Sequence, residues 1–145
     1  MRLPAREYRT ILRRVPILCV DGIIVNRRGQ VLLVKRKNEP FRNRWWVPGG
    51  RVLKGETLEQ AFRRKMREEL GIAVKVLAPV GYYEGRHARG PGKVRGGVHA
   101  VSVVFRAAPR SLRIRLDGQS AAWGFFDRLP GPLRRLKRFE GRPRP

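Results

Sequence analysis

Residues 50–72 read GRVLKGETLEQAFRRKMREELGI, a glycine turn followed by a charged helix and a second glycine. The helix is predicted over 58–70, because Thr57 and Gln60 have the spacing of a capping box and Gly71 supplies a typical C-terminal stop. Carboxylates gathered on one helix face beside a glycine turn form oxygen-rich sites, at which Mg²⁺ bridges protein and substrate phosphates. The segment therefore predicts a site that handles diphosphate groups.

This segment resembles the signature of the Nudix hydrolases. That signature is a glycine, five residues, a glutamate, seven residues and then Arg-Glu-apolar-any-Glu-Glu-any-Gly-apolar. A match of this length is far more specific than a lone glycine motif. One position departs, because Lys65 stands where the signature has the glutamate of its Arg-Glu pair. The positions that match are Gly50, Glu56, Arg64, Met66, Glu68, Glu69, Gly71 and Ile72.

The fold predicted from the order of elements is an α+β domain with a mixed sheet. The resemblance implies a Nudix fold, an α/β/α sandwich in which a mixed β-sheet lies between helices. A chain of 145 residues is long enough for one domain, here 1–145, with a frayed basic tail at 140–145. The expected elements are a helix at 5–14, a hairpin at 16–37, strands at 72–80, 98–106 and 121–126, and a basic amphipathic helix at 132–139.

The charge is extreme, since 34 basic and 11 acidic residues give a net +23. Such a field attracts polyanions, either a nucleic acid or a small phosphorylated ligand. A general compositional bias towards arginine explains the excess equally well, and the two explanations stay open. No apolar run is as long as a membrane span, and the N-terminus does not read as a secretory signal. The single Cys19 is expected to be a buried, inert thiol. A cytoplasmic location without a membrane partner is expected.

From Tyr8 to Ile72 the chain resembles the GDP-mannose mannosyl hydrolase branch more closely, above all in PILCVDGIIV, WWVPGGRV and ETLEQAF. That branch also lacks the first acid of the Arg-Glu pair. The resemblance implies displacement at C1 of the sugar with inversion, release of the nucleoside diphosphate, and one Mg²⁺ on the diphosphate, with Mn²⁺ as a second candidate ion. It also implies a homodimer formed through the N-terminal segment.

The metal-binding roles follow from this resemblance. Glu69 matches the glutamate that binds the metal, the Gly49 carbonyl matches a backbone ligand, and Gln119 matches a side-chain ligand from a later loop. Glu68 has two open readings, as a further ligand or as the partner of Arg64 in an ion pair.

The substrate-binding roles follow in the same way. Arg36, Arg51 and Arg64 match arginines that hold the diphosphate or orient the metal-binding glutamate. Asp21 matches an acid in the first strand, and His87 matches a loop histidine near the substrate.

This chain departs from the GDP-mannose mannosyl hydrolase branch at the position of the general base. Ser120 stands where the branch has a histidine, and serine is a poor base for activating water. His87 is the candidate titrating substitute, whereas His99 is expected to be structural. Lys65 is either a solvated partner of Glu69 or the residue that removes one metal ligand.

Three functions are compatible with these residues. The favoured one is hydrolysis of an NDP-sugar resembling GDP-mannose at C1. The second is pyrophosphate cleavage with attack at phosphorus. The third is a catalytically impaired protein that binds nucleotides or RNA, although nucleic acid is the less favoured partner.

Overall fold

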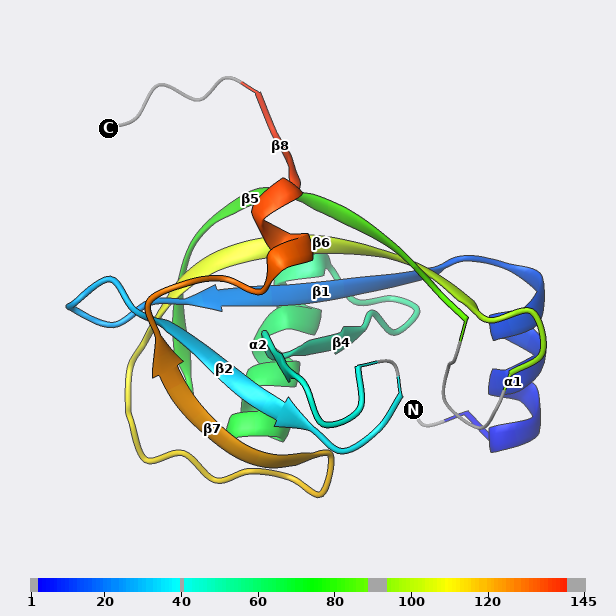
Figure 1. The fold of residues 1–145 in the computed structure, drawn as a ribbon, viewed down its shortest axis with the longest axis horizontal. Helices are drawn as coiled ribbons and strands as arrows, with labels where there is room; N and C mark the ends of the chain where they lie inside the picture. Colours follow the sequence, from blue (N-terminus) through cyan, green and yellow to red (C-terminus); the bar gives the residue numbers. More distant parts are fainter. Residues whose placement is uncertain (1–2, 40, 89–93, 141–145) are drawn as a thin grey trace.

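The computed structural model describes residues 3–39, 41–88 and 94–140. These residues form two sheets and two α-helices (Figure 1). The α-helices are α1 (Ala5–Arg14) and α2 (Leu58–Leu70). The strands are β1 (Ile17–Ile24), β2 (Val31–Arg36), β3 (Trp45–Trp46), β4 (Gly49–Arg51), β5 (Val74–His87), β6 (Val98–Pro109), β7 (Ser120–Phe126) and β8 (Lys137–Arg138), and a 3₁₀ helix spans Gly131–Arg135. The α+β prediction is confirmed.

The larger sheet has the strand order β4-β1-β6-β5-β8, and the smaller sheet has the order β3-β2-β7. Strands β1 and β6 run parallel, while β1–β4 and β5–β6 are antiparallel, so the larger sheet is mixed as predicted. The parallel pair places the start of β6 beside the start of β1 and leaves β4 on the other side of β1. This arrangement brings the glycine turn and the predicted site onto one end of the sheet.

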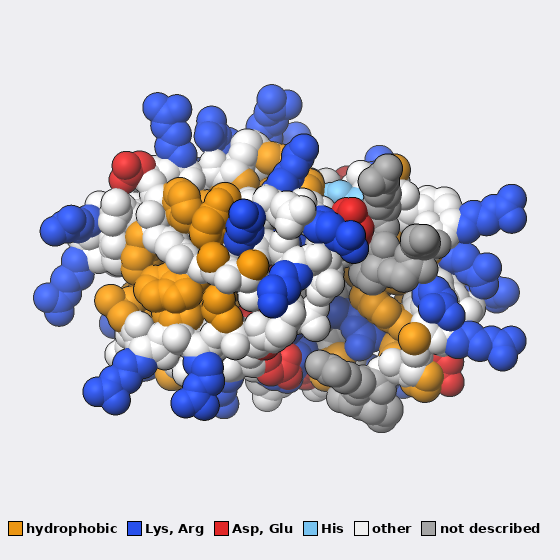
Figure 2. All heavy atoms as spheres, turned by 60° about the horizontal axis from the view of Figure 1, so that its bottom comes forward, with side chains coloured by type: hydrophobic (Ala, Val, Ile, Leu, Met, Phe, Trp, Pro, Cys, Tyr) orange, Lys and Arg blue, Asp and Glu red, His pale blue; other side chains and the backbone are white. Residues whose placement is uncertain are grey.

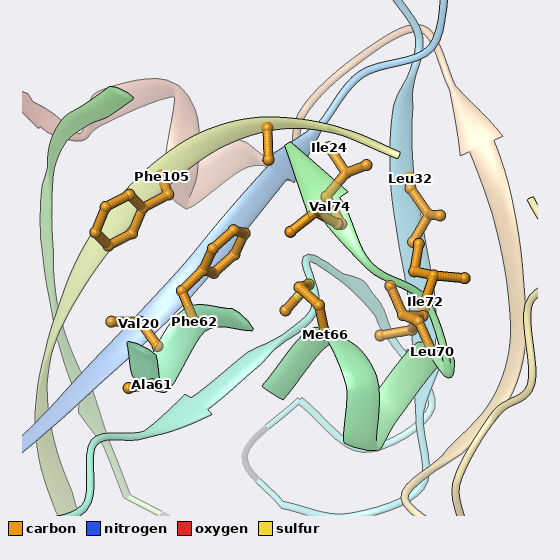
Figure 3. Packing of buried hydrophobic residues seen from close by; sticks show 12 residues of the cluster. Val20, Ile24, Leu32, Ala61, Phe62, Met66, Leu70, Ile72, Val74 and Phe105 are labelled. Atoms are coloured by element: carbon orange, nitrogen blue, oxygen red, sulfur yellow. The ribbon is translucent and has the colours of Figure 1, made fainter. Parts of the chain in front are cut away.

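Helix α2 begins and ends where the sequence predicts. Both hydrogen bonds of the Thr57–Gln60 capping box are present, and Gly71 closes the helix with a left-handed φ of 67°. Figure 3 shows its apolar side chains, among them Phe62 and Met66, within the core cluster that includes residues of β1, β2 and β6. The Phe62 ring stacks on Phe105 with centroids 5.2 Å apart. The apolar face thus fixes which face of α2 is left for chemistry.

The predicted hairpin at 16–37 is wrong. The tight turn does form, with the Gly29 N–H donating to the Asn26 carbonyl and an isolated bridge joining Val25 to Val31. Beyond that turn the two strands diverge, because β1 pairs with β4 and β6 while β2 pairs with β3 and β7. The apolar residues of both strands then face the core between sheets, which a two-stranded hairpin could not provide.

The predicted helix at 132–139 is also wrong. The segment forms a 3₁₀ helix that stops at Arg135, and β8 then pairs with β5. Gly81 permits this pairing, because a Cβ there would lie 2.2 Å from the Lys137 carbonyl oxygen. The predicted frayed tail falls almost entirely on residues outside the described ranges.

Strand β5 extends beyond the predicted end at residue 80 and takes up the first part of the expected loop before residue 98. It pairs with β6 as far as His87, with register shifts on either side of Pro79, which cannot donate to a ladder. His87 therefore ends a strand and does not lie in a polar loop.

Surface charge is spread over the face drawn in Figure 2, where Lys and Arg side chains project at intervals from all sides of the outline. That spread is typical of a general excess of basic residues. Within the described ranges, neither helix is long and apolar enough to cross a membrane.

Candidate functional site

One cavity of about 730 Å³ gathers every residue that the sequence predicts for the site. A volume of this size suits a small molecule such as a nucleotide derivative. Its walls come from β1, β4, α2, the ends of β2 and β5, and the segment before β7. The predicted residues that line it are Asp21, Arg36, Gly49, Arg51, Arg64, Glu68, Glu69, His87 and Gln119.

Arg64 contacts several separate parts of the chain at the charged end of the cavity. Its Nε lies 3.1 and 3.0 Å from the two carboxylate oxygens of Glu56, and its Nη2 donates to the Arg51 carbonyl at 2.9 Å. Its Nη1 reaches Glu68 at 3.1 Å. The hydrogen bond from Arg64 is the main cause that lowers the pKa of Glu56. Arg64 therefore ties α2 to β4 and to the preceding loop, and its donors are largely engaged within the protein.

Glu68 and Glu69 are neighbours with different surroundings. The Glu68 side chain is half exposed and pairs with Arg64, which supports the ion-pair reading. Burial alone would raise its pKa, but the Arg64 hydrogen bonds and the Lys65 charge hold it below the ordinary value.

Glu69 is 7% exposed, and its Oε2 accepts the Gly49 N–H at 3.0 Å. Burial raises the pKa of Glu69 to about 7, against the opposing charge of Lys65 and the Gly49 hydrogen bond. A buried carboxylate at the wall of a cavity is costly unless a cation compensates it, so Glu69 suits a role that brings a cation to the site.

The Lys65 ammonium lies against both carboxylates. Its Nζ is 3.5 Å from Glu68 Oε2 and 3.6 Å from Glu69 Oε1, and the Lys65 side chain is only 16% exposed. The predicted pairing of Lys65 with Glu69 is therefore confirmed, whereas its description as a solvated helix lysine is wrong, because its side chain is largely covered.

Asp21 lies on β1 across from Gly49 on β4. It is 8% exposed, and burial raises its pKa to about 6 against a hydrogen bond from Ser102. A Cβ at position 49 would lie 2.1 Å from Asp21 Oδ1 and 2.2 Å from the Val20 carbonyl oxygen. Only glycine fits there, which explains in physical terms why the turn needs it.

Arg36 and Arg51 flank the glycine turn as expected. The Arg51 guanidinium lies 4.7 Å from the ring centroid of Tyr8 on α1, in a cation–π contact. Arg36 ends β2, and its charge favours the ionised forms of Asp21 and Glu69. Both arginines line the cavity.

Gln119 lies just before β7 and lines the cavity, where its side-chain oxygen accepts a hydrogen bond from Asn38. Its neighbour Ser120 is 6% exposed, pairs with Arg36 in the β2–β7 ladder, and lies outside the cavity lining. The position at which the branch has its base therefore offers the cavity no titrating group.

An aromatic wall, defined by Phe41, Trp46, Tyr83 and His87, also lines the cavity. The Phe41 ring stacks on Trp46 with centroids 4.4 Å apart and meets His87 edge-on at 4.8 Å. Phe41 holds a left-handed φ of 65°, an uncommon conformation for a bulky residue. Burial and the nearby Arg36 charge lower the pKa of His87. Its imidazole is therefore neutral near pH 7 and able to accept a proton.

Sequence reasoning missed several residues of the cavity. Tyr8, Cys19, Phe41, Tyr83 and Asp117 all line it. Cys19 was expected to be fully buried but is only partly so, and burial raises the pKa of its thiol to about 12. Only Tyr8 carried a signal, through its place on the inner face of the first helix.

The oxygen-donating groups that line the cavity indicate what kind of metal site it could form. Among the described residues, no three His, Cys, Asp or Glu side chains form a cluster able to hold one. Glu69 nevertheless fits a hard cation, because it is a buried carboxylate at the cavity wall, with the Lys65 ammonium 3.6 Å away. The oxygen donors present fit one ion at Glu69 better than the multi-carboxylate cage that several ions would need.

A family model described as NUDIX domain matches residues 16–134. The chain belongs to the Nudix family. Among solved structures, the MutT protein from Methanosarcina mazei Go1 shares the fold of this Nudix chain, with a TM-score of 0.68 and 21% identity over 83% of this chain and 90% of that one. The predicted family and the predicted Nudix fold are both confirmed.

Two curated relatives resemble this Nudix chain in sequence. The low-salt glycan biosynthesis protein Agl8 of Haloferax volcanii is 34% identical over 87% of this chain and 80% of its own length. The ADP-ribose pyrophosphatase of Methanocaldococcus jannaschii is 40% identical over 69% of this chain, which spans about half (54%) of that relative.

Proposed function

We propose that this Nudix chain hydrolyses a nucleoside-diphosphate sugar resembling GDP-mannose, cleaving it at C1 of the sugar. The observation that carries the proposal is the set of residues that line the cavity described above. One end joins the buried carboxylate of Glu69 to the cations Arg36, Arg51 and Lys65, and another side is aromatic. A diphosphate fits the cationic end, and a planar base fits the aromatic wall. The similarity to a glycan biosynthesis protein supports a sugar-containing substrate.

The arginines bind the leaving group. Guanidinium groups match phosphate oxygens in planar, two-pronged hydrogen bonds, and Arg36 and Arg51 both line the cavity. Charge that develops on the departing diphosphate is neutralised there. Arg64 acts by positioning, because its guanidinium fixes Glu56, Glu68 and the Arg51 backbone.

Glu69, with the Gly49 carbonyl and the Gln119 side chain, would hold a divalent ion, Mg²⁺ or Mn²⁺. When bound, that ion would withdraw charge from the diphosphate and improve it as a leaving group. Glu68 contributes mainly to the Arg64 ion pair.

His87 is the proposed general base. Water attacks C1, its proton passes to the neutral imidazole of His87, and the bond between C1 and the diphosphate oxygen breaks with both electrons staying on that oxygen. The products are the free sugar and the nucleoside diphosphate. The lowered pKa of His87 and its place in the wall of the cavity suit this role.

The first test is turnover of an NDP-sugar panel with Mg²⁺, with the products separated by chromatography. Release of a nucleoside diphosphate and a free sugar is expected. Release of a nucleoside monophosphate and a sugar phosphate would favour the second candidate, pyrophosphate cleavage. The similarity to an ADP-ribose pyrophosphatase favours that candidate.

A third candidate is a binding protein that keeps the phosphate cradle without catalysis. The burial of Ser120 and the cation at Lys65 favour it. Absence of turnover across the panel, together with nanomolar RNA binding at physiological salt, would establish this candidate and defeat the first. The cytoplasmic location and the homodimer stay predictions.

A further inference from the structure

Lys65 is held in one place by three features of the fold. Its ammonium lies 3.5 Å from Glu68 Oε2 and 3.6 Å from Glu69 Oε1, one helical turn along α2. Its side chain is 16% exposed, and its residue lines the cavity together with both glutamates. A lysine that only solubilised the helix would extend into water.

Gly50 supplies the space in which this side chain lies. A Cβ built at Gly50 would be 2.5 Å from Lys65 Cε, 3.0 Å from Cδ and 3.1 Å from Nζ. The end of the lysine therefore passes directly over the backbone of β4, between the glycine turn and the carboxylates. A residue with any side chain at position 50 would push the ammonium away.

The position of this ammonium is one where a divalent ion would also be attracted, beside two carboxylates at the wall of the cavity. A fixed positive charge within about 4 Å of that position repels a second cation strongly in a partly desolvated site. It also leaves N–H donors facing the cavity, and ammonium is a strong partner for phosphate oxygens.

We propose that the Lys65 ammonium is a built-in cation of the site, which takes the place of a second metal ion beside Glu68 and Glu69, in addition to the one ion held by Glu69, and contacts the diphosphate of the substrate. This inference deepens the proposed function, since it rests on a diphosphate occupying the cationic end. It assigns Lys65 a binding role of its own, beyond the loss of one ligand.

The first experiment counts metal ions without substrate. Mn²⁺ binding is followed by the electron paramagnetic resonance signal of the free ion in the wild type, Lys65→Glu, Lys65→Gln and the control Lys75→Gln. Lys75 is an exposed lysine on β5 outside the cavity, so the control removes the same charge elsewhere. Lys65→Glu is expected to bind at least one more Mn²⁺ per chain than the wild type, and Lys75→Gln the wild-type number.

The second experiment measures GDP binding by calorimetry in EDTA, where no metal contributes. Lys65→Gln is expected to weaken binding roughly 10- to 100-fold, the range for a hydrogen bond to a charged group. Lys65→Arg should restore part of the affinity, and Lys75→Gln should bind as the wild type does.

The inference fails if folded Lys65→Glu gains no Mn²⁺, or if Lys65→Gln binds GDP as tightly as the wild type. Circular dichroism establishes that each variant is folded, and the Gln variant decides the question if the Glu variant does not fold. Both readouts are independent of turnover. Wild-type hydrolysis with unchanged Lys65→Gln binding would refute only this inference, whereas the expected binding results without any hydrolysis would refute only the proposed function.

Discussion

The charged end and the aromatic wall of the same cavity are built in opposite ways. Most of the charged end comes from one continuous stretch, β4 and α2, which Arg64 and the Gly49–Glu69 hydrogen bond join, and Arg36 is added from β2. The aromatic wall is assembled from separate segments, with Phe41 and Trp46 between β2 and β4 and Tyr83 and His87 on β5. The first region is mostly local in sequence, and the second depends on how distant strands meet. We therefore expect the charged end to set the chemistry and the aromatic wall to set the choice of substrate, apart from His87.

The largest loss of activity is expected when His87 is replaced, since it is the one residue of the aromatic wall that is assigned a role in the chemistry. His87→Gln removes the proposed base and should lower kcat by roughly 10²–10⁴-fold, the range typical of general bases. Because the pKa of His87 lies below its ordinary value, protonation of its imidazole should lower the rate only below pH 6.5. Glu69, with a pKa of about 7, adds an acid limb of its own, which His87→Gln should keep. Steady-state rates from pH 4.5 to 8 test both points. A kcat that His87→Gln leaves unchanged at pH 8 would assign the base elsewhere.

Glu69→Gln tests the charged end directly. The amide keeps the shape but not the charge, so the site loses the carboxylate that attracts a cation. We expect kcat/KM to fall roughly 10²–10³-fold, as when one preorganised electrostatic group is removed. Glu59→Gln is the matched control, since Glu59 lies on the outer face of α2 and pairs with Arg63. Equal effects of the two substitutions would show that the loss is not specific to the site.

Phe41→Ala tests whether the aromatic wall affects substrate binding separately from the chemistry of the charged end. Loss of an aromatic surface that stacks on a base costs about 1–3 kcal/mol. KM should therefore rise about tenfold or more, while kcat changes little. A fall in kcat with unchanged KM would place Phe41 in the chemistry instead, and the division between the two regions would break down.

The smallest effect is expected in how the free energy of unfolding depends on pH. The pKa of Glu69 is about 7 in the folded chain, against an ordinary 4.5, and that of Asp21 is about 6 against 3.8. Between those values the folded state binds protons that the unfolded chain releases, so the free energy of unfolding should rise as pH falls from 7.5 towards 5. Urea titrations in EDTA measure it, and Glu69→Gln should flatten the slope. A wild-type protein that becomes less stable over this range would contradict the assignment.

The same contrast explains how far the sequence could predict this molecule. Capping, the helix limits and the Arg64–Glu68 pair follow from spacing along one segment and were predicted, whereas the contact of Arg64 with Glu56 was not. The hairpin at 16–37 was not predictable from its turn, because the alternative partners of β1 and β2 lie far away in the chain. Phe41 gave no signal, since its loop has neither periodicity nor a motif. Lys65 was visible as a departure, but its contact with Gly50 and the two carboxylates needed three-dimensional packing.

The central claim is that the charged end supports displacement at carbon. Product identity alone does not test it, because attack at the sugar-bearing phosphorus would also release a free sugar and a nucleoside diphosphate. Hydrolysis of GDP-mannose in ¹⁸O-labelled water, with both products analysed by mass spectrometry, decides which bond breaks. Displacement at carbon places one ¹⁸O atom in the sugar and none in the nucleotide, whereas label in the phosphate product would rule out displacement at carbon.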